Sequence, residues 1–242
     1  MRIESAFILS FMILAMASPA WANDDMAAMM AAEHGDGTFH MFRAETDYGI
    51  GKDGGIARWD VKGWVGGDDN KIWLKTEGAH VGGKVDDAEF WALYSCNIST
   101  FWDAQVGIRY DAKPTSRGYA TIGFNGLASY FFETEAHLFI SDKGDVSARL
   151  REENDFLLTQ KLIVQPYAEI NLFAQNVPER DVGAGVSDAQ IGIQTRYEFS
   201  RTFAPYVDVH YGRLFGETES IARRHGKGND DLIGAIGLRL MF

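Results

Sequence analysis

The residues DLIGAIGLRLMF at the end of the chain alternate between two faces. Taking every second residue places Leu232, Ile236 and Phe242 together on one side, whereas Arg239 falls on the other. In water, such a terminal strand would leave an apolar surface uncovered. In a membrane the same surface meets lipid, so the pattern predicts a membrane strand.

The same alternation recurs through most of residues 41–242, in extended segments separated by turns rich in Gly, Asp and Asn. It is clearest at 102–111, 161–172 and 189–199, where apolar faces end in aromatic residues and the other faces carry charges and amides. Most segments run for about ten residues or more, which suits a tilted transmembrane strand better than the strands of a soluble β-sandwich. We count about twelve segments, and the even number predicts an all-β, closed antiparallel transmembrane β-barrel.

Some positions are harder to assign. The segment AEFWALYSCNI at 88–98 is apolar on both faces, and VSARLREENDFLLT at 146–159 begins polar and turns apolar, so their register stays open. The tryptophans are interpreted as girdle residues at the lipid interfaces rather than as cation–π sites. These tryptophans are Trp59, Trp64, Trp73, Trp91 and Trp102.

The N-terminal region predicts export. Arg2 precedes an apolar run over residues 6–17, and Ala20 and Ala22 form a small-x-small cleavage site. This is typical of a signal peptide over residues 1–22, because a spanning helix needs about 20 apolar residues. We expect a short flexible leader at 23–40, then the barrel at 41–242, and location in the outer membrane.

Net charge, cysteine content and the absence of catalytic motifs reduce the number of function classes that fit the sequence. With 23 Lys and Arg against 34 Asp and Glu, the net charge of −11 argues against nucleic acid as a partner and is compatible with cations. The single cysteine, Cys96, cannot form an intrachain disulfide. The sequence contains no nucleophile-elbow serine, phosphate loop or His-x-x-x-His pair, so we expect a protein that is not an enzyme.

Several longer stretches carry a family resemblance. They are WDVKGWVGGDDNKIWLKTEG at 59–78, LYSCNISTFWDAQVGIRYD at 93–111, LLTQKLIVQPYAEIN at 157–171, RYEFSRTFAPYVDV at 196–209 and the closing GLRLMF. In this order they resemble the copper resistance protein B family of exported outer-membrane proteins. The resemblance implies a barrel that binds copper, Cu(I) or Cu(II), and helps to keep periplasmic copper tolerable. It also implies a periplasmic copper-binding protein of the same system as a partner, beside outer-membrane lipid.

The sequence departs from the family at two places. Its leader is short, where the family's is long and dense in Met and His, and Cys96 stands where the family usually has Arg. A role for the Cys96 thiol is therefore not a family trait.

Given this resemblance, the leader is the first candidate copper site. Thioether sulfur suits Cu(I), and imidazole suits Cu(I) and Cu(II) alike. The alternative is that these are ordinary leader residues without a function. The candidate ligands are Met26, Met29, Met30, His34, His40 and Met41.

The polar strand faces supply a second set of candidates. Glu133, Glu135 and His137 share one face by alternation, as do Asp208 and His210, and a carboxylate beside an imidazole can chelate a divalent cation. The alternative is that they form ordinary ion pairs in the barrel interior. The partners expected in that case are Arg109, Arg149, Arg151, Arg196 and Arg239.

Two other functions stay open at this point. A polar barrel interior alone is compatible with a general channel for small solutes, and some outer-membrane barrels are hydrolases. The stretch RRHGKG at 223–228 is expected to be a solvated outer loop whose basic residues meet anionic headgroups.

Overall fold

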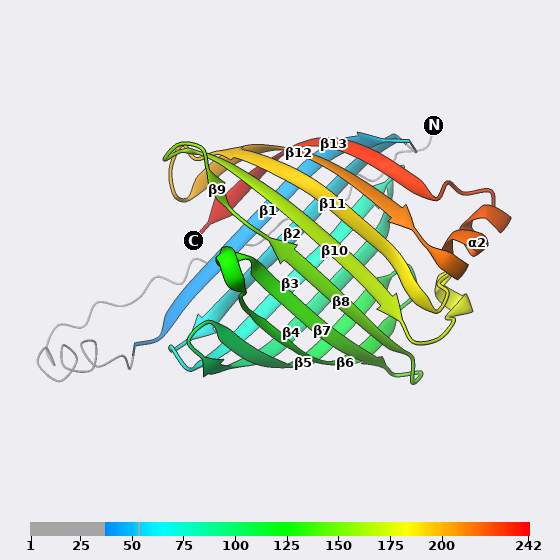
Figure 1. The fold of residues 1–242 in the computed structure, drawn as a ribbon, viewed down its shortest axis with the longest axis horizontal. Coiled ribbons are helices and arrows are strands. Elements are labelled where there is room, and N and C mark those ends of the chain that lie inside the picture. Colours follow the sequence, from blue (N-terminus) through cyan, green and yellow to red (C-terminus); the bar gives the residue numbers. More distant parts are fainter. Residues whose placement is uncertain (1–36, 53) are drawn as a thin grey trace, which may run out of the picture. The chain divides into compact units, whose positions relative to one another are not determined.

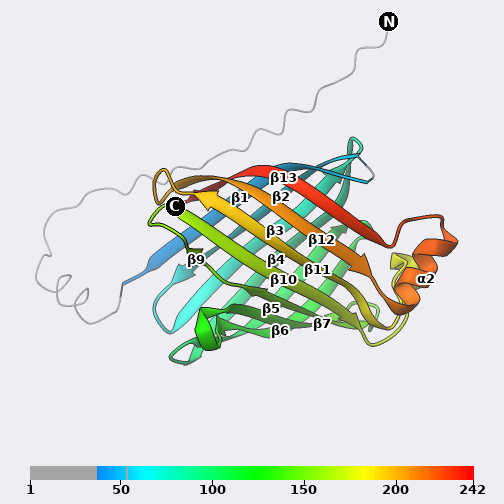
Figure 2. The same ribbon diagram turned by 45° about the horizontal axis from the view of Figure 1, so that its top comes forward.

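The computed structural model describes residues 37–52 and 54–242. Their strands pair side by side into one sheet that curves around a central space, as Figure 1 and the turned view in Figure 2 show. The strands are β1 (Phe39–Gly51), β2 (Gly54–Gly66), β3 (Asn70–Val81), β4 (Lys84–Ser99), β5 (Trp102–Lys113), β6 (Arg117–Leu127), β7 (Glu133–Ser141), β8 (Val146–Glu153), β9 (Phe156–Leu157), β10 (Leu162–Phe173), β11 (Gly185–Tyr197), β12 (Phe203–Leu214) and β13 (Asp230–Met241).

Three short helices lie in the connections: η1 (Ser129–Phe131), η2 (Pro178–Arg180) and α2 (Gly216–Arg224). None of the helices in the described residues has the length and hydrophobicity needed to cross a membrane.

The sheet closes on itself. Successive strands pair antiparallel, and β13 returns to pair with β1 from Arg43↔Met241 to Ile50↔Gly234. Strands β8 and β9 both pair with β10 and are two pieces of one wall strand, interrupted at Asn154. The wall therefore has twelve positions, which confirms the predicted antiparallel barrel, and closure leaves no strand edge unpaired.

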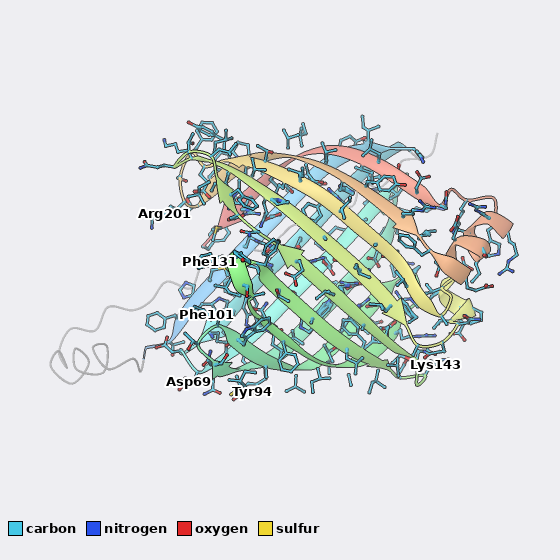
Figure 3. All side chains as sticks on the ribbon, viewed as in Figure 1. Asp69, Tyr94, Phe101, Phe131, Lys143 and Arg201 are labelled. Carbon is cyan, nitrogen blue, oxygen red and sulfur yellow. The ribbon has the colours of Figure 1, made fainter. Side chains whose placement is uncertain are left out.

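The two faces of the wall are inverted relative to a water-soluble protein. Ile236 in β13 is 68% exposed on the outside, whereas Arg239 is only 5% exposed and points inward. The outward faces of β5 and β11 are apolar in the same way, as the alternation predicted. Exposed aromatic residues such as Phe101 and Phe131 lie near one end of the barrel (Figure 3). The outer surface is therefore suited to lipid.

The interior also contains an apolar cluster, which the sequence did not predict. We call it the aromatic cluster: Trp73, Trp91, Leu93, Tyr119 and Phe139, with Met41 and Trp64 packed against it. It explains why β4 is apolar on both faces, since alternate residues of β4 meet lipid and this cluster. The girdle interpretation is therefore wrong for Trp64, Trp73 and Trp91, whereas Trp102 does lie on the outward face of β5.

The two ends of the barrel differ. At the end where β1 begins and β13 finishes, here the terminus end, the connections are short, and Phe242 N donates to Phe42 O at 2.9 Å. The other end, here the loop end, carries the two longest connections, 174–184 and 215–229 (Figure 1). Outer-membrane barrels have short periplasmic turns and longer extracellular loops, so the loop end faces outward.

The connection at 215–229 corrects one expectation. Its first part is not a loop: α2 ends at Arg224, so the first two residues of RRHGKG are helical and only the remainder is irregular. Arg223 is paired with Glu219 at 2.5 Å, and Arg224 with Glu217 at 3.2 Å. These arginines are therefore already neutralised by carboxylates of their own helix.

Candidate functional site: the lumen

The space enclosed by the wall, the lumen, is lined by the aromatic cluster and, over the rest of its surface, by the polar faces of the strands. Alternation sends Arg43, Glu45 and Asp47 of β1 inward, and Arg149 and Arg151 of β8 inward from the opposite side. These side chains are largely buried although none is apolar, because each is held by an opposite charge. The lumen is therefore a packed ionic interior rather than an empty pore.

A cavity of about 280 Å³ remains within this interior. Its wall carries more acidic than basic side chains. The carboxylates are Glu45, Asp47, Asp60, Glu77, Asp87, Glu89, Glu153, Glu169 and Asp208, and the guanidinium groups are Arg43, Arg58, Arg149, Arg151 and Arg239. Nine carboxylates against five guanidinium groups give the cavity a negative field, which attracts cations and repels anions.

Asp208 and His210 on β12 face the lumen as predicted and touch each other. His210 Nδ1 lies 2.6 Å from Asp208 Oδ1, and both residues are buried. Arg58 of β2 donates to Asp208 at 3.0 Å and lies 2.9 Å from His210 Nε2, while Tyr167 donates to Asp208 at 2.9 Å. The arginine thus occupies the position that a cation would take between the two groups.

Glu133, Glu135 and His137 on β7 have different partners. Glu135 accepts from Lys62 at 3.2 Å and from Lys75 at 2.5 Å. His137 Nε2 lies 2.8 Å from Gln105 Oε1, and its ring packs edge-on against Trp91 in the aromatic cluster. Glu133 is exposed at the start of the strand. The structure therefore does not bring these three side chains together around one point.

The leader candidates fall into two groups. Met26, Met29, Met30 and His34 lie outside the described residues. His40 and Met41 are the second and third residues of β1, and they point to opposite sides of the wall: His40 is exposed, whereas Met41 packs against the aromatic cluster. Across residues 37–52 and 54–242, no three side chains of His, Cys, Asp or Glu are placed to hold a metal ion together.

The five arginines expected as partners do form ion pairs, but with other carboxylates. Arg109 pairs with Glu89 and Asp111, Arg149 with Glu77, Glu89 and Glu169, Arg151 with Asp60, Glu77 and Glu169, Arg196 with Asp155 and Glu198, and Arg239 with Glu45. The actual partners of the candidate acids, Arg58, Lys62 and Lys75, were missed. Alternation in β2 and β3 does place all three on the polar face. It would therefore have predicted them as charges that face the barrel interior.

The connection at 174–184 folds over the loop end of the lumen. Arg180 of η2 donates to Asp111 at 2.8 Å and to the hydroxyl of Tyr119, so the connection reaches over β7 and β8 to β5 and β6. Burial alone would lower the pKa of the Arg180 guanidinium, but Tyr119 and Asp111 hold it above its usual value. Asp111 is completely buried beneath it. The sequence indicated only a loop here.

Comparison with known proteins gives a sequence relationship over the same residues. The family model described as copper resistance protein B precursor matches residues 38–242. Copper resistance protein B of Escherichia coli is 40% identical over 76% of the chain and 62% of its own length. A copper resistance protein B homolog of Pseudomonas syringae pv. tomato is 39% identical over 78% of the chain and 65% of its own length. The chain thus spans less than two thirds of the length of these relatives.

Solved structures give a likeness in fold. The NanC porin aligns with a TM-score of 0.57 at 11% identity, over 81% of the chain and 98% of the porin. The KdgM porin aligns with a TM-score of 0.51 at 9% identity, over 83% of the chain and 99% of the porin. At this identity, the likeness concerns the barrel alone.

Proposed function

Because the chain belongs to the copper resistance protein B family, we propose that it binds copper in the outer membrane and contributes to copper resistance. It does so by holding copper on the periplasmic side or by passing it outward. A periplasmic copper-binding protein of the same system delivers the metal, and the role is not enzymatic.

The observation that carries this proposal, beside the family, is the charge of the lumen. Nine carboxylates and five guanidinium groups surround the 280 Å³ cavity. Copper ions are cations in both oxidation states, so this field favours their entry and disfavours that of anions. The same excess of acid would be unfavourable in a channel for acidic solutes.

The ligands belong to two separate places. The thioethers of Met26, Met29 and Met30, with the imidazole of His34, supply soft ligands that suit Cu(I). In the lumen, Asp208 and His210 supply an oxygen and a nitrogen that suit Cu(II), once Arg58 withdraws. Capture in the leader and transfer into the lumen would follow in that order.

Isothermal titration of the full mature chain tests the leader site. Cu(I) is titrated under reducing conditions into the unchanged chain and into a variant with Met26→Leu, Met29→Leu and Met30→Leu. We expect the variant to lose most Cu(I) binding, because leucine keeps the size of methionine but removes its sulfur. Met241→Leu in the wall is the matched control and should bind as the unchanged chain does.

Unchanged Cu(I) binding by the triple variant would exclude the thioethers of Met26, Met29 and Met30 as the site. A variant with Asp208→Asn and His210→Gln then shows whether the lumen binds instead.

A general channel for small solutes is the second candidate, and a barrel with a polar interior is compatible with it. It predicts an ionic conductance that does not respond to copper. A hydrolase would instead turn over lipid esters in detergent.

A further inference from the structure

A chain of five alternating charges crosses the lumen in its terminus half. Arg43 Nη2 lies 3.5 Å from Glu153, and Lys62 Nζ lies 3.3 Å from the same carboxylate. Lys62 also lies 3.2 Å from Glu135, which in turn is 2.5 Å from Lys75. We call these five residues the cross-lumen chain.

The cross-lumen chain joins opposite walls of the barrel. Lys62 is on β2 and Glu153 on β8, which are six positions apart in the ring of twelve and therefore face each other. Glu135 on β7 contacts Lys62, and Lys75 on β3 contacts Glu135, so the cross-lumen chain also includes the strands next to β2 and β8. The side chains of all five residues are only 8–13% exposed. Four ionic contacts thus hold the two walls together through the middle of the lumen.

Two cavities of the lumen border this bridge. Arg43 and Glu153 line the 280 Å³ cavity, whose wall also includes Asp47 and Asp208 toward the loop end and Gln165 and Gln194 in the terminus halves of β10 and β11. The other three residues of the chain line a second cavity of only about 20 Å³, which is scarcely room for one water molecule. An ion in either cavity therefore lies next to part of the cross-lumen chain.

The local structure around Glu153 is suited to movement. Glu153 is the last residue of β8, and the wall strand is interrupted at Asn154 before β9 resumes pairing with β10. β8 has 8 residues and β7 has 9, whereas every other long strand has at least 11. The carboxylate thus sits at the end of one of the two shortest long strands, beside an interruption where Asn154 N still donates to Pro166 O at 3.2 Å, so it can shift without the separation of a full strand.

We propose that the cross-lumen chain is the gate of the barrel and that Glu153 is its movable element. In the closed state Glu153 neutralises Arg43 and Lys62 and blocks the lumen. In the open state it releases them, and a permeating cation takes their place on Glu153 and Glu135. This gate concerns the lumen itself and is tested with potassium chloride, so its failure would leave copper binding untouched.

The test is the current carried by the full mature chain in a planar lipid bilayer under a potassium chloride gradient. Glu153→Gln removes the carboxylate that Arg43 and Lys62 share, and leaves Arg43 with Glu45 and Lys62 with Glu135. We expect a several-fold rise in conductance and a reversal potential shifted toward chloride. Lys62→Gln should also raise the conductance but shift the reversal potential toward potassium. Opposite shifts show that both charges face the path of the ions, and the rise in conductance in both variants separates a gate from charges that only line the lumen.

Glu152→Gln is the matched control. Glu152 precedes Glu153 on β8, faces the other side of the wall and accepts from Thr134 at 2.7 Å, a bond that the glutamine carbonyl can keep. It should leave both conductance and reversal potential unchanged. If Glu153→Gln and Lys62→Gln both conduct as the unchanged chain does, or if their reversal potentials shift in the same direction, the cross-lumen chain is not the gate.

Discussion

At the scale of single residues, stability in this barrel depends on buried charges that are fully paired. Arg109 is the clearest case: it lies 2.5 Å from Glu89 and 2.6 Å from Asp111, and its guanidinium carbon lies 4.8 Å from the ring centre of Phe139. It therefore serves both the ionic interior and the aromatic cluster, whose rings can stabilise a cation through their faces.

Removing that cation should be costly. We expect Arg109→Met to lower the free energy of unfolding by about 3–5 kcal/mol, because it leaves buried carboxylates with less compensation. Urea unfolding of the barrel in lipid vesicles measures the change. Arg213→Met at the exposed rim should alter the free energy by no more than about 0.5 kcal/mol. Equal effects of the two substitutions would show that the pairing of Arg109 contributes little.

At the scale of whole elements, the lipid-facing side of β13 makes a graded prediction. Ile236 lies at the middle of the strand and Leu240 near its terminus end, both on the outward face. Ile236→Arg should destabilise the barrel by about 2–4 kcal/mol, and Leu240→Arg by only about 0–1 kcal/mol, because the cost of a charge falls toward the interface. Urea unfolding in vesicles again gives both values. If the outward face met water, neither arginine would be costly.

Elements differ in how far the sequence predicts them. For β5, β11 and β13 the sequence predicted both the strand and which of its residues point outward. This was possible because one side of each strand meets lipid and the other meets charges. β4 was not, since the aromatic cluster makes its inward face apolar as well. The interruption at Asn154 falls where the segment 146–159 changes from polar to apolar, which had left its register open. α2 packs through the small residues Thr218 and Ala222. It has no long apolar stripe from which a helix could have been predicted.

At the scale of the whole molecule, the lumen could be predicted in character but not in detail. Polar faces indicated a charged interior, and the candidates Asp208 and His210 were correctly placed on it. Alternation could place Arg58 on the polar face, but it could not identify Arg58 as their partner, because Arg58 is 150 residues away from Asp208 in sequence and meets it only through the closure of the ring. The same holds for Arg43 and Glu153, which are 110 residues apart.

The central claim is that this barrel confers copper resistance, and copper tolerance in living cells tests it most directly. A host that lacks its own copper resistance protein B would express the full chain, with an unrelated small-solute porin at equal folded amount as the control. Our account predicts growth at higher external copper than the porin allows. Copper tolerance equal to that of the porin control would contradict it, and would favour a general channel.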